Sequence, residues 1–208
     1  MTTVLNLPPA DRFIETGLGH GDTLAETGGP QGYPVRISIE LDPVLADAGQ
    51  RRFAGDPTVT ILTGYSPAML PRVCDPTQRT VFWLDAHYSG EGFSQDMARS
   101  VGLARDWGEC PLLSELAAIA AVPWMTRPAV FIDDALFFCC VDDAGFALAQ
   151  AAGGVAGAHR EGWPSLAAIA HLLSGYRIMA DPTWRYLACR PPDWTGPFAP
   201  WGEAWTLS

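Results

Sequence analysis

Short apolar runs rich in β-branched residues recur along the chain, and most of them end in an acidic residue or a turn. Runs of about four to eight such residues are typical of buried strands. We therefore predict strands over residues 12–15, 35–40, 58–62, 80–85 and 129–133. Nearer the C-terminus, residues 176–180 and 184–189 predict a closing antiparallel pair.

Helical patterns separate several of these strands. Residues 110–122 place apolar side chains at helical spacing, Asp42-Pro43 opens a second helix, and residues 163–173 predict a third. Alternating strands and helices indicate the α/β class with a mainly parallel sheet. We predict one domain over residues 1–208, with its core at about 12–190 and an irregular Pro- and Trp-rich tail over 191–208.

Composition and charge exclude several classes of partner. The 208 residues are 48% hydrophobic and 17% charged, which is typical of a globular protein, and the net charge of −10 argues against nucleic acid or an anionic membrane as a partner. The first residues lack the pattern of a signal peptide, and no apolar run reaches the roughly 18–20 residues of a membrane span. We expect a cytoplasmic protein whose five cysteines are reduced.

A glycine-rich loop follows the first predicted strand. Its pattern is Glu15-x-Gly17-x-Gly19-x-Gly21, and Glu40 ends the second strand 25 residues after Glu15. Glycines let the backbone approach a ligand closely, and an acid in that place can accept hydrogen bonds from ribose hydroxyls. Together these features favour an adenosine-type cofactor, although a plain strand-to-helix turn and a solvated acid are the alternatives.

The glycine spacing distinguishes between cofactors. It is G-x-G-x-G and not the G-x-G-x-x-G of dinucleotide-binding enzymes, and the sequence has neither a P-loop motif nor any lysine. A donor without a pyrophosphate, such as S-adenosylmethionine, suits this loop best.

The fourth predicted strand ends in Asp85-x-His87-Tyr88. Ligands of open α/β sheets bind outside the carboxyl ends of the strands, so a carboxylate and an imidazole there predict a reaction centre. Residues 91–109 follow directly and predict either a loop that closes over the acceptor or a passive surface loop.

Five segments in chain order resemble a group of bacterial class I S-adenosylmethionine-dependent methyltransferases. They are F-I-E-T-G at 13–17, I-S-I-E-L at 37–41, F-W-L-D-A-H-Y-S-G at 82–90, C-P-L-L-S-E-L at 110–116 and I-D-D-A at 132–135. The resemblance covers about 12–190. It implies a Rossmann-like fold with a mostly parallel seven-stranded sheet and an antiparallel C-terminal strand.

The resemblance also implies the residues that would bind S-adenosylmethionine. They are Glu15, Thr16, Gly17, Gly19, Gly21, Asp22, Thr23, Glu40, Leu41, Tyr65, Ser66 and Asp85. Tyr65 departs from the family pattern, which has aspartate there to accept a hydrogen bond from the adenine amino group. A tyrosine can stack or donate through its hydroxyl, so this departure alters adenosine recognition.

A more distant similarity to macrocin-type sugar O-methyltransferases implies a metal-assisted reaction. Asp85, Asp133 and Asp134 would hold Mg²⁺ or another divalent cation, and His87 would act as the base. The acceptor would meet the predicted catalytic residues Asp85, His87 and Tyr88. The alternatives are that Asp133 and Asp134 cap the following helix and that His87 orients Asp85.

These observations predict a methyltransferase that modifies a hydroxyl of a sugar or small natural product. Its partners would be that small-molecule acceptor and, given eight tryptophans and the apolar tail, a second copy in a homodimer. Two rival functions are a catalytically inactive Rossmann-like binding module and a nucleotide-dependent oxidoreductase.

Overall fold

The computed structural model describes residues 7–29, 32–87, 110–135, 138, 163–181, 185–195, 198 and 206–207. Tyr88, the predicted loop at 91–109 and most of the tail lie outside these residues. No helix in the described ranges combines the length and hydropathy that a membrane span requires.

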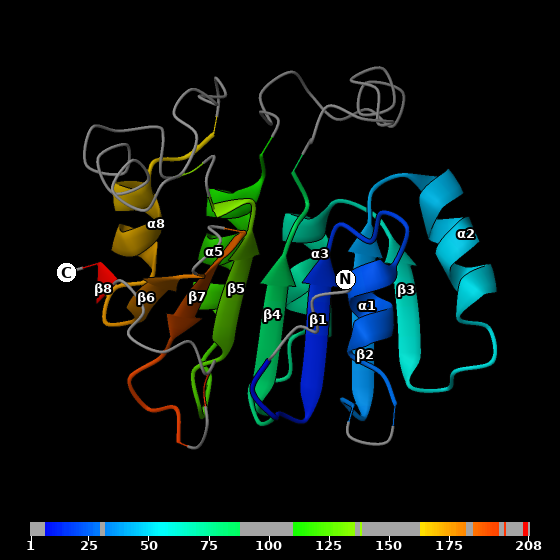
Figure 1. Cartoon of the computed structure of the whole chain (residues 1–208), viewed down its shortest axis with the longest axis horizontal. Helices are drawn as coiled ribbons and strands as arrows, with labels where there is room; N and C mark the ends of the chain where they lie inside the picture. Colours follow the sequence, from blue (N-terminus) through cyan, green and yellow to red (C-terminus); the bar gives the residue numbers. More distant parts are fainter. Residues whose placement is uncertain are drawn as a thin grey trace.

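The first five strands are parallel and form one side of the sheet, from the edge strand β3 to β5 (Figure 1). They are β1 (Arg12–Thr16), β2 (Val35–Glu40), β3 (Val59–Thr63), β4 (Thr80–Leu84) and β5 (Ala129–Asp133). The order across the sheet is β3-β2-β1-β4-β5-β7-β6-β8. β4 is buried at every position, because helices cover both faces of a parallel sheet.

The predicted closing pair is β6 (Arg177–Ala180) and β7 (Tyr186–Arg190), and β7 runs antiparallel to both β5 and β6. The predicted α/β class and mostly parallel sheet with an antiparallel C-terminal strand are therefore confirmed. One detail differs: β8 (Thr206–Leu207) in the tail adds a short eighth strand beside β6. Pairing there satisfies backbone groups that the edge of β6 would otherwise expose, so the tail is not wholly irregular.

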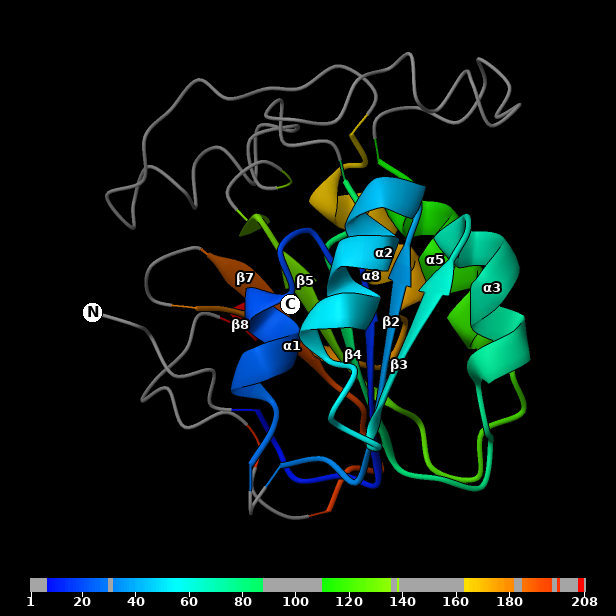
Figure 2. The same cartoon turned by 90° about the vertical axis from the view of Figure 1, so that its right-hand side faces the viewer.

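Two helical layers enclose the sheet (Figure 2). On one face lie α1 (Asp22–Glu26) and α2 (Pro43–Arg52), and on the other lie α3 (Ser66–Val73), α5 (Leu112–Ala120) and α8 (Leu166–Leu172). The predicted helices correspond to α2, α5 and α8. Asp42 caps α2 by accepting a hydrogen bond of 2.7 Å from the Val44 amide, and Pro43 occupies the first turn, as the sequence predicts.

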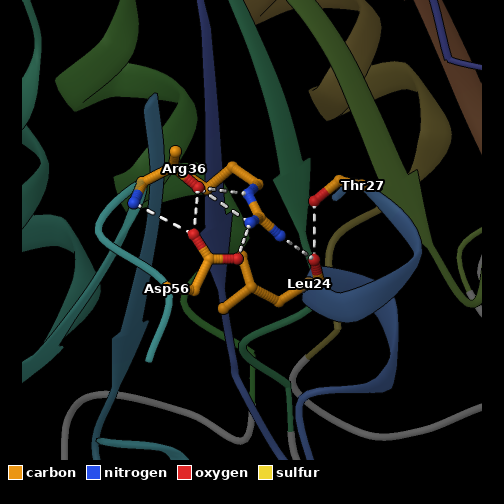
Figure 3. Close-up of polar contacts among 5 residues, drawn as sticks. Leu24, Thr27, Arg36 and Asp56 are labelled. Carbon is orange, nitrogen blue, oxygen red and sulfur yellow. Dashed lines mark hydrogen bonds and ion pairs between the residues drawn. The ribbon is translucent and has the colours of Figure 1, made fainter. Parts of the chain in front are cut away.

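Arg36 anchors α1 to the sheet from the amino-terminal part of β2 (Figure 3). Its side chain is 4% exposed, forms an ion pair with Asp56 and donates a hydrogen bond of 3.1 Å to the Leu24 carbonyl. The Thr27 hydroxyl donates to the same carbonyl at 2.7 Å. Because Leu24 lies in α1, these contacts fix the helix that follows the glycine loop.

Candidate functional site

The glycine-rich loop joins β1 to α1 and lies directly against the end of β4. Gly17 and Gly21 have φ of 80° and 81°, in the left-handed region that favours glycine. A Cβ on Gly17 would lie 2.3 Å from the carbonyl oxygen of Asp85, so no other residue fits at position 17 without a shift of the backbone. The close approach at Gly17 is to the backbone of the predicted reaction centre, and the approach of this loop to a ligand stays a prediction.

Glu40 braces this loop. Its side chain lies at the end of β2, is 5% exposed as a residue, and accepts hydrogen bonds from the Gly19 amide at 3.1 Å and from the Asp42 amide at 2.9 Å. The sequence predicted Glu40 as a ribose ligand, and that role remains a prediction. The bracing of the loop is a second role that the sequence pattern did not reveal.

Four carboxyl groups form a row across adjacent strand ends. Within β1, Glu15 pairs with Ser38 of β2 and Trp83 of β4, and side chains two residues apart on a strand share a face. Glu40 and Asp85 therefore share the face of Glu15, and Asp133 extends the row on β5 because Leu84 and Ile132 are in register. We call Glu40, Glu15, Asp85 and Asp133 the carboxyl row.

Burial raises the pKa of every member of the carboxyl row. It raises the pKa of Glu15 to about 8, although the Ser38 hydroxyl, which donates to Glu15 Oε2 at 2.5 Å, opposes the shift. Burial also raises the pKa of Glu40 and Asp133. For Asp85 the pKa is raised well above its usual value, first by burial and then by the charges of Asp133 and Glu15. A positively charged ligand beside this row would relieve the repulsion.

His87 connects the ends of β4 and β5. Its Nε2 lies 2.8 Å from Asp134 Oδ2 and 3.3 Å from Asp85 Oδ1. The imidazole is 4% exposed and packs against Trp163, with 4.7 Å between ring centroids, and against Phe138 at 6.2 Å. The close contact to an acceptor oxygen of Asp134 indicates that Nε2 carries a proton there.

The three predicted metal carboxylates make different contacts in the structure. Two of the three, Asp85 and Asp134, have an oxygen near His87 Nε2. The third, Asp133, has its Oδ1 buried without a hydrogen bond and 3.8 Å from Arg185 Nε. In the ranges that the structure describes, no three histidine, cysteine or acidic side chains are grouped to hold a metal ion. These residues therefore do not fit the predicted divalent cation.

A second polar network lies on the opposite face of the sheet. The Ser66 hydroxyl at the start of α3 donates to Glu115 Oε1, and the hydroxyl of Thr16 in β1 also bonds Glu115. Glu115 is 1% exposed, and burial raises its pKa. Tyr65 precedes Ser66, is half-buried, and shares a hydrogen bond with the Ser114 side chain.

The remaining predicted donor residues surround the glycine loop without entering the carboxyl row. Asp22 is exposed and forms an ion pair of 2.7 Å with Arg52, while Thr23 and Leu41 are half-buried. The sequence did not single out Ser38 or Arg185, which contact the carboxyl row from β2 and from the start of β7. Their roles depend on strand register, which no local motif reports.

The sequence matches no protein-family model and no curated protein. Solved structures do match, among them an O-methyltransferase family protein from Burkholderia thailandensis, with 16% identity, a TM-score of 0.50, and coverage of 88% of this chain and 51% of that one. A spermidine synthase from Thermotoga maritima has 14% identity, a TM-score of 0.52, and coverage of 89% and 55%. A spermidine synthase in complex with the transition-state analogue AdoDATO has 13% identity, a TM-score of 0.52, and coverage of 90% and 57%.

These likenesses establish the fold. The chain has the Rossmann-like class I methyltransferase fold and spans little more than half the length of each of the three proteins. Two of the three are named as spermidine synthases and the third as an O-methyltransferase family protein. Because proteins of this fold are named for different reactions, the fold alone does not identify the reaction of this chain.

Proposed function

We propose that the chain is an S-adenosylmethionine-dependent methyltransferase. The observation that carries the proposal is the carboxyl row beside the glycine loop, where Gly17 touches the backbone of Asp85. The fold of methyltransferases and the motifs at 13–17 and 82–90 support the same reaction class.

The charge of the row favours this donor over a dinucleotide. S-adenosylmethionine carries a positive sulfonium and a positive ammonium group, both of which a row of carboxylates attracts. Burial raises the pKa of Glu15, Asp85 and Asp133, so a cation beside them would favour their ionised form. A pyrophosphate would find no positive charge in this row and no lysine in the chain. The loop residues therefore fit S-adenosylmethionine, and the oxidoreductase alternative is disfavoured.

Asp85 is the residue best placed to act as the base. Bound S-adenosylmethionine supplies an electrophilic methyl group and leaves as S-adenosylhomocysteine. The Asp85 side chain is 30% exposed at the end of β4 and has a raised pKa, so its carboxylate can accept the proton of an acceptor hydroxyl as the new carbon–oxygen bond forms. His87, which is enclosed by Trp163 and bonded to Asp134, then acts as a positioning residue for Asp85.

This assignment selects one of the two roles considered for His87. A free base would need an unprotonated nitrogen facing the acceptor, but Nε2 faces carboxylates on the ends of two strands. Because the described carboxylates do not fit a metal ion, no step is assigned to one.

The proposed acceptor is a hydroxyl of a sugar or small natural product, and the proposed setting is the cytoplasm. A homodimer is the proposed assembly. None of these three rests on the geometry of the carboxyl row. The acceptor follows from the resemblance to sugar O-methyltransferases, the cytoplasm from the missing signal-peptide pattern, and the homodimer from the tryptophans and the apolar tail.

Tyr65 supports a second candidate function, a binding module without turnover. The side chain stands at the carboxyl end of β3, where the family pattern has aspartate, and its hydroxyl is bonded to Ser114. Such a module would bind the nucleoside and transfer nothing.

Calorimetric titration with S-adenosylmethionine, S-adenosylhomocysteine and NAD⁺ tests these proposals. We expect both sulfur ligands to bind and NAD⁺ to give no signal. No binding of either sulfur ligand at millimolar concentration would contradict the proposed function. Binding without methyl transfer to a broad panel of sugar and natural-product hydroxyls would favour the binding module.

A further inference from the structure

Glu115 is a buried acid that the proposed chemistry does not use. It belongs to α5, where its neighbours on the buried face, Leu112, Leu116 and Ile119, all belong to the core. A carboxyl group buried in such surroundings costs free energy unless hydrogen bonds compensate it. The two hydroxyl groups that bond it, from Ser66 and Thr16, therefore explain how the side chain is accommodated.

The two partners of Glu115 come from two different strand ends. Thr16 is the last residue of β1, and its carbonyl accepts a hydrogen bond of 2.9 Å from the Asp85 amide. Ser66 begins α3 immediately after the turn that follows β3, and the Gly64 amide in that turn donates to the Glu40 carbonyl at 2.8 Å. One carboxyl thus connects the backbone beside Asp85 with the backbone beside Glu40.

The same turn of α5 also holds Tyr65. Ser114, the residue before Glu115, shares a hydrogen bond with Tyr65, and the charge of Glu115 is felt at the Tyr65 hydroxyl. Tyr65 and Ser66 are therefore both held from α5, by adjacent residues. Tyr65 lies just past the carboxyl end of β3, beside the strand that carries Glu40, and so at the end of the sheet where open α/β folds bind ligands.

We propose that Glu115 is a positioning residue of the donor site, which fixes the Tyr65-Ser66 turn against the ends of β1 and β3 and so sets the affinity for the nucleoside half of the donor. This inference rests on the proposed function, because it requires that the site bind an adenosine-containing ligand. It adds a specificity role for a residue that touches neither the acceptor nor the carboxyl row.

Two substitutions separate positioning from simple support of the fold. Glu115→Ala removes both hydrogen-bonded contacts, whereas Glu115→Gln keeps an amide oxygen that can accept from the hydroxyls of Ser66 and Thr16. Leu116→Ala is the matched control, because it destabilises the same helix through lost packing alone. Ser66→Ala removes one partner and serves where Glu115→Ala fails to fold.

Each variant is titrated with S-adenosylhomocysteine and with adenosine, and its thermal unfolding is recorded. We expect Glu115→Ala and Ser66→Ala to lower the affinity for both ligands by about tenfold, which corresponds to the free energy of one hydrogen bond. The affinities of Glu115→Gln should remain within about threefold of those of the unaltered chain. Leu116→Ala should lower the melting temperature without changing either affinity.

The outcomes distinguish failure of the proposed function from failure of the positioning role of Glu115. If the unaltered chain binds neither ligand, the proposed function fails and this inference fails with it. If the unaltered chain binds and Glu115→Ala and Ser66→Ala bind equally well, only the positioning role is overturned. Equal weakening by Leu116→Ala would likewise overturn it, since general loosening of α5 would then account for the effect.

Discussion

The missing side chain of Gly17 leaves room for the carbonyl of Asp85: a Cβ at position 17 would lie 2.3 Å from that oxygen. The donor loop and the proposed catalytic strand end therefore pack without space between them. Gly17→Ala should displace one or the other, and its φ of 80° adds strain of about 1 kcal/mol. We expect a loss of at least about tenfold in affinity for S-adenosylhomocysteine, measured by calorimetry.

Gly55→Ala is the matched control for this substitution. Its Cβ would meet open space, and its φ lies outside the range that L side chains avoid. Affinity that is unchanged in both variants would show that the loop and the end of β4 do not need this close contact.

The pKa of Glu15 predicts how stability depends on pH. Its value in the folded chain is about 8 against an ordinary 4.5, so the folded state holds the proton more tightly than the unfolded state does. The resulting stabilisation is complete below pH 4.5 and is lost as the pH rises through about 8. The free energy of unfolding should fall across this window by up to about 1.4 kcal/mol per pH unit for this group.

Glu15→Gln removes this titrating group, so the free energy of unfolding should fall less steeply as the pH rises. Urea unfolding at both ends of the window measures it, and Glu26→Gln, on the exposed surface of α1, is the control. If the free energy of unfolding changes with pH equally in the unaltered chain and in Glu15→Gln, the pKa of Glu15 is not raised in the folded chain and its side chain is ionised there.

Asp85→Asn tests both the charge of the carboxyl row and the proposed base. S-adenosylmethionine carries the sulfonium and S-adenosylhomocysteine lacks it. Removing one negative charge should therefore lower the affinity for S-adenosylmethionine by about tenfold more than the affinity for S-adenosylhomocysteine. Once an acceptor is known, the turnover rate should fall by about 10²–10⁴-fold. Asp47→Asn changes the same charge on the exposed face of α2 and should alter neither quantity. Equal losses for the two ligands would argue against a sulfonium beside Asp85.

Removal of divalent cations should leave donor binding unchanged. One oxygen of Asp85 and one of Asp134 face His87 Nε2, and the proposed donor contacts lie on the glycine loop. Calorimetric titration of S-adenosylhomocysteine before and after treatment with EDTA measures this. A loss of affinity that Mg²⁺ restores and Na⁺ does not would show that a metal completes the site.

Arg36→Met should destabilise the fold strongly. The guanidinium is almost fully buried, and its removal takes the ion pair from Asp56 and one of the two hydrogen bonds from the Leu24 carbonyl, which keeps that of Thr27. We expect a cost of about 1–3 kcal/mol for the lost buried hydrogen bond. Arg52→Met breaks the more exposed pair with Asp22 and should cost less than about 1 kcal/mol. Chemical denaturation compares the two; equal effects would mean that the Arg36 contacts contribute no more than a surface pair.

The structural features that depend on residues close together in the chain were predictable from the sequence. The run that became β5 is apolar from Ala129 to Ile132 and ends in Asp133, and the structure ends the strand at the same residue. The αL glycines and the cap at Asp42 were likewise predictable, because each depends on neighbouring residues alone.

The contacts that define the site were not predictable in this way. Ser66 and Glu115 are separated by 49 residues, and their bond exists because α3 and α5 pack side by side. The environment of His87 depends on Trp163, which lies just before α8 and far from His87 in the sequence. The motif D-x-H therefore predicted that these side chains lie at the end of a strand but not which of their atoms face outward.

Arg36 has a consequence for the cost of binding. It fixes the far end of α1 to the sheet, while Gly17 fixes the near end of the loop to β4. A loop held at both ends is already ordered before a ligand arrives, so little conformational entropy remains to be lost. The donor site is in this sense preorganised from the amino-terminal end of the strands, by a residue that no ligand would touch.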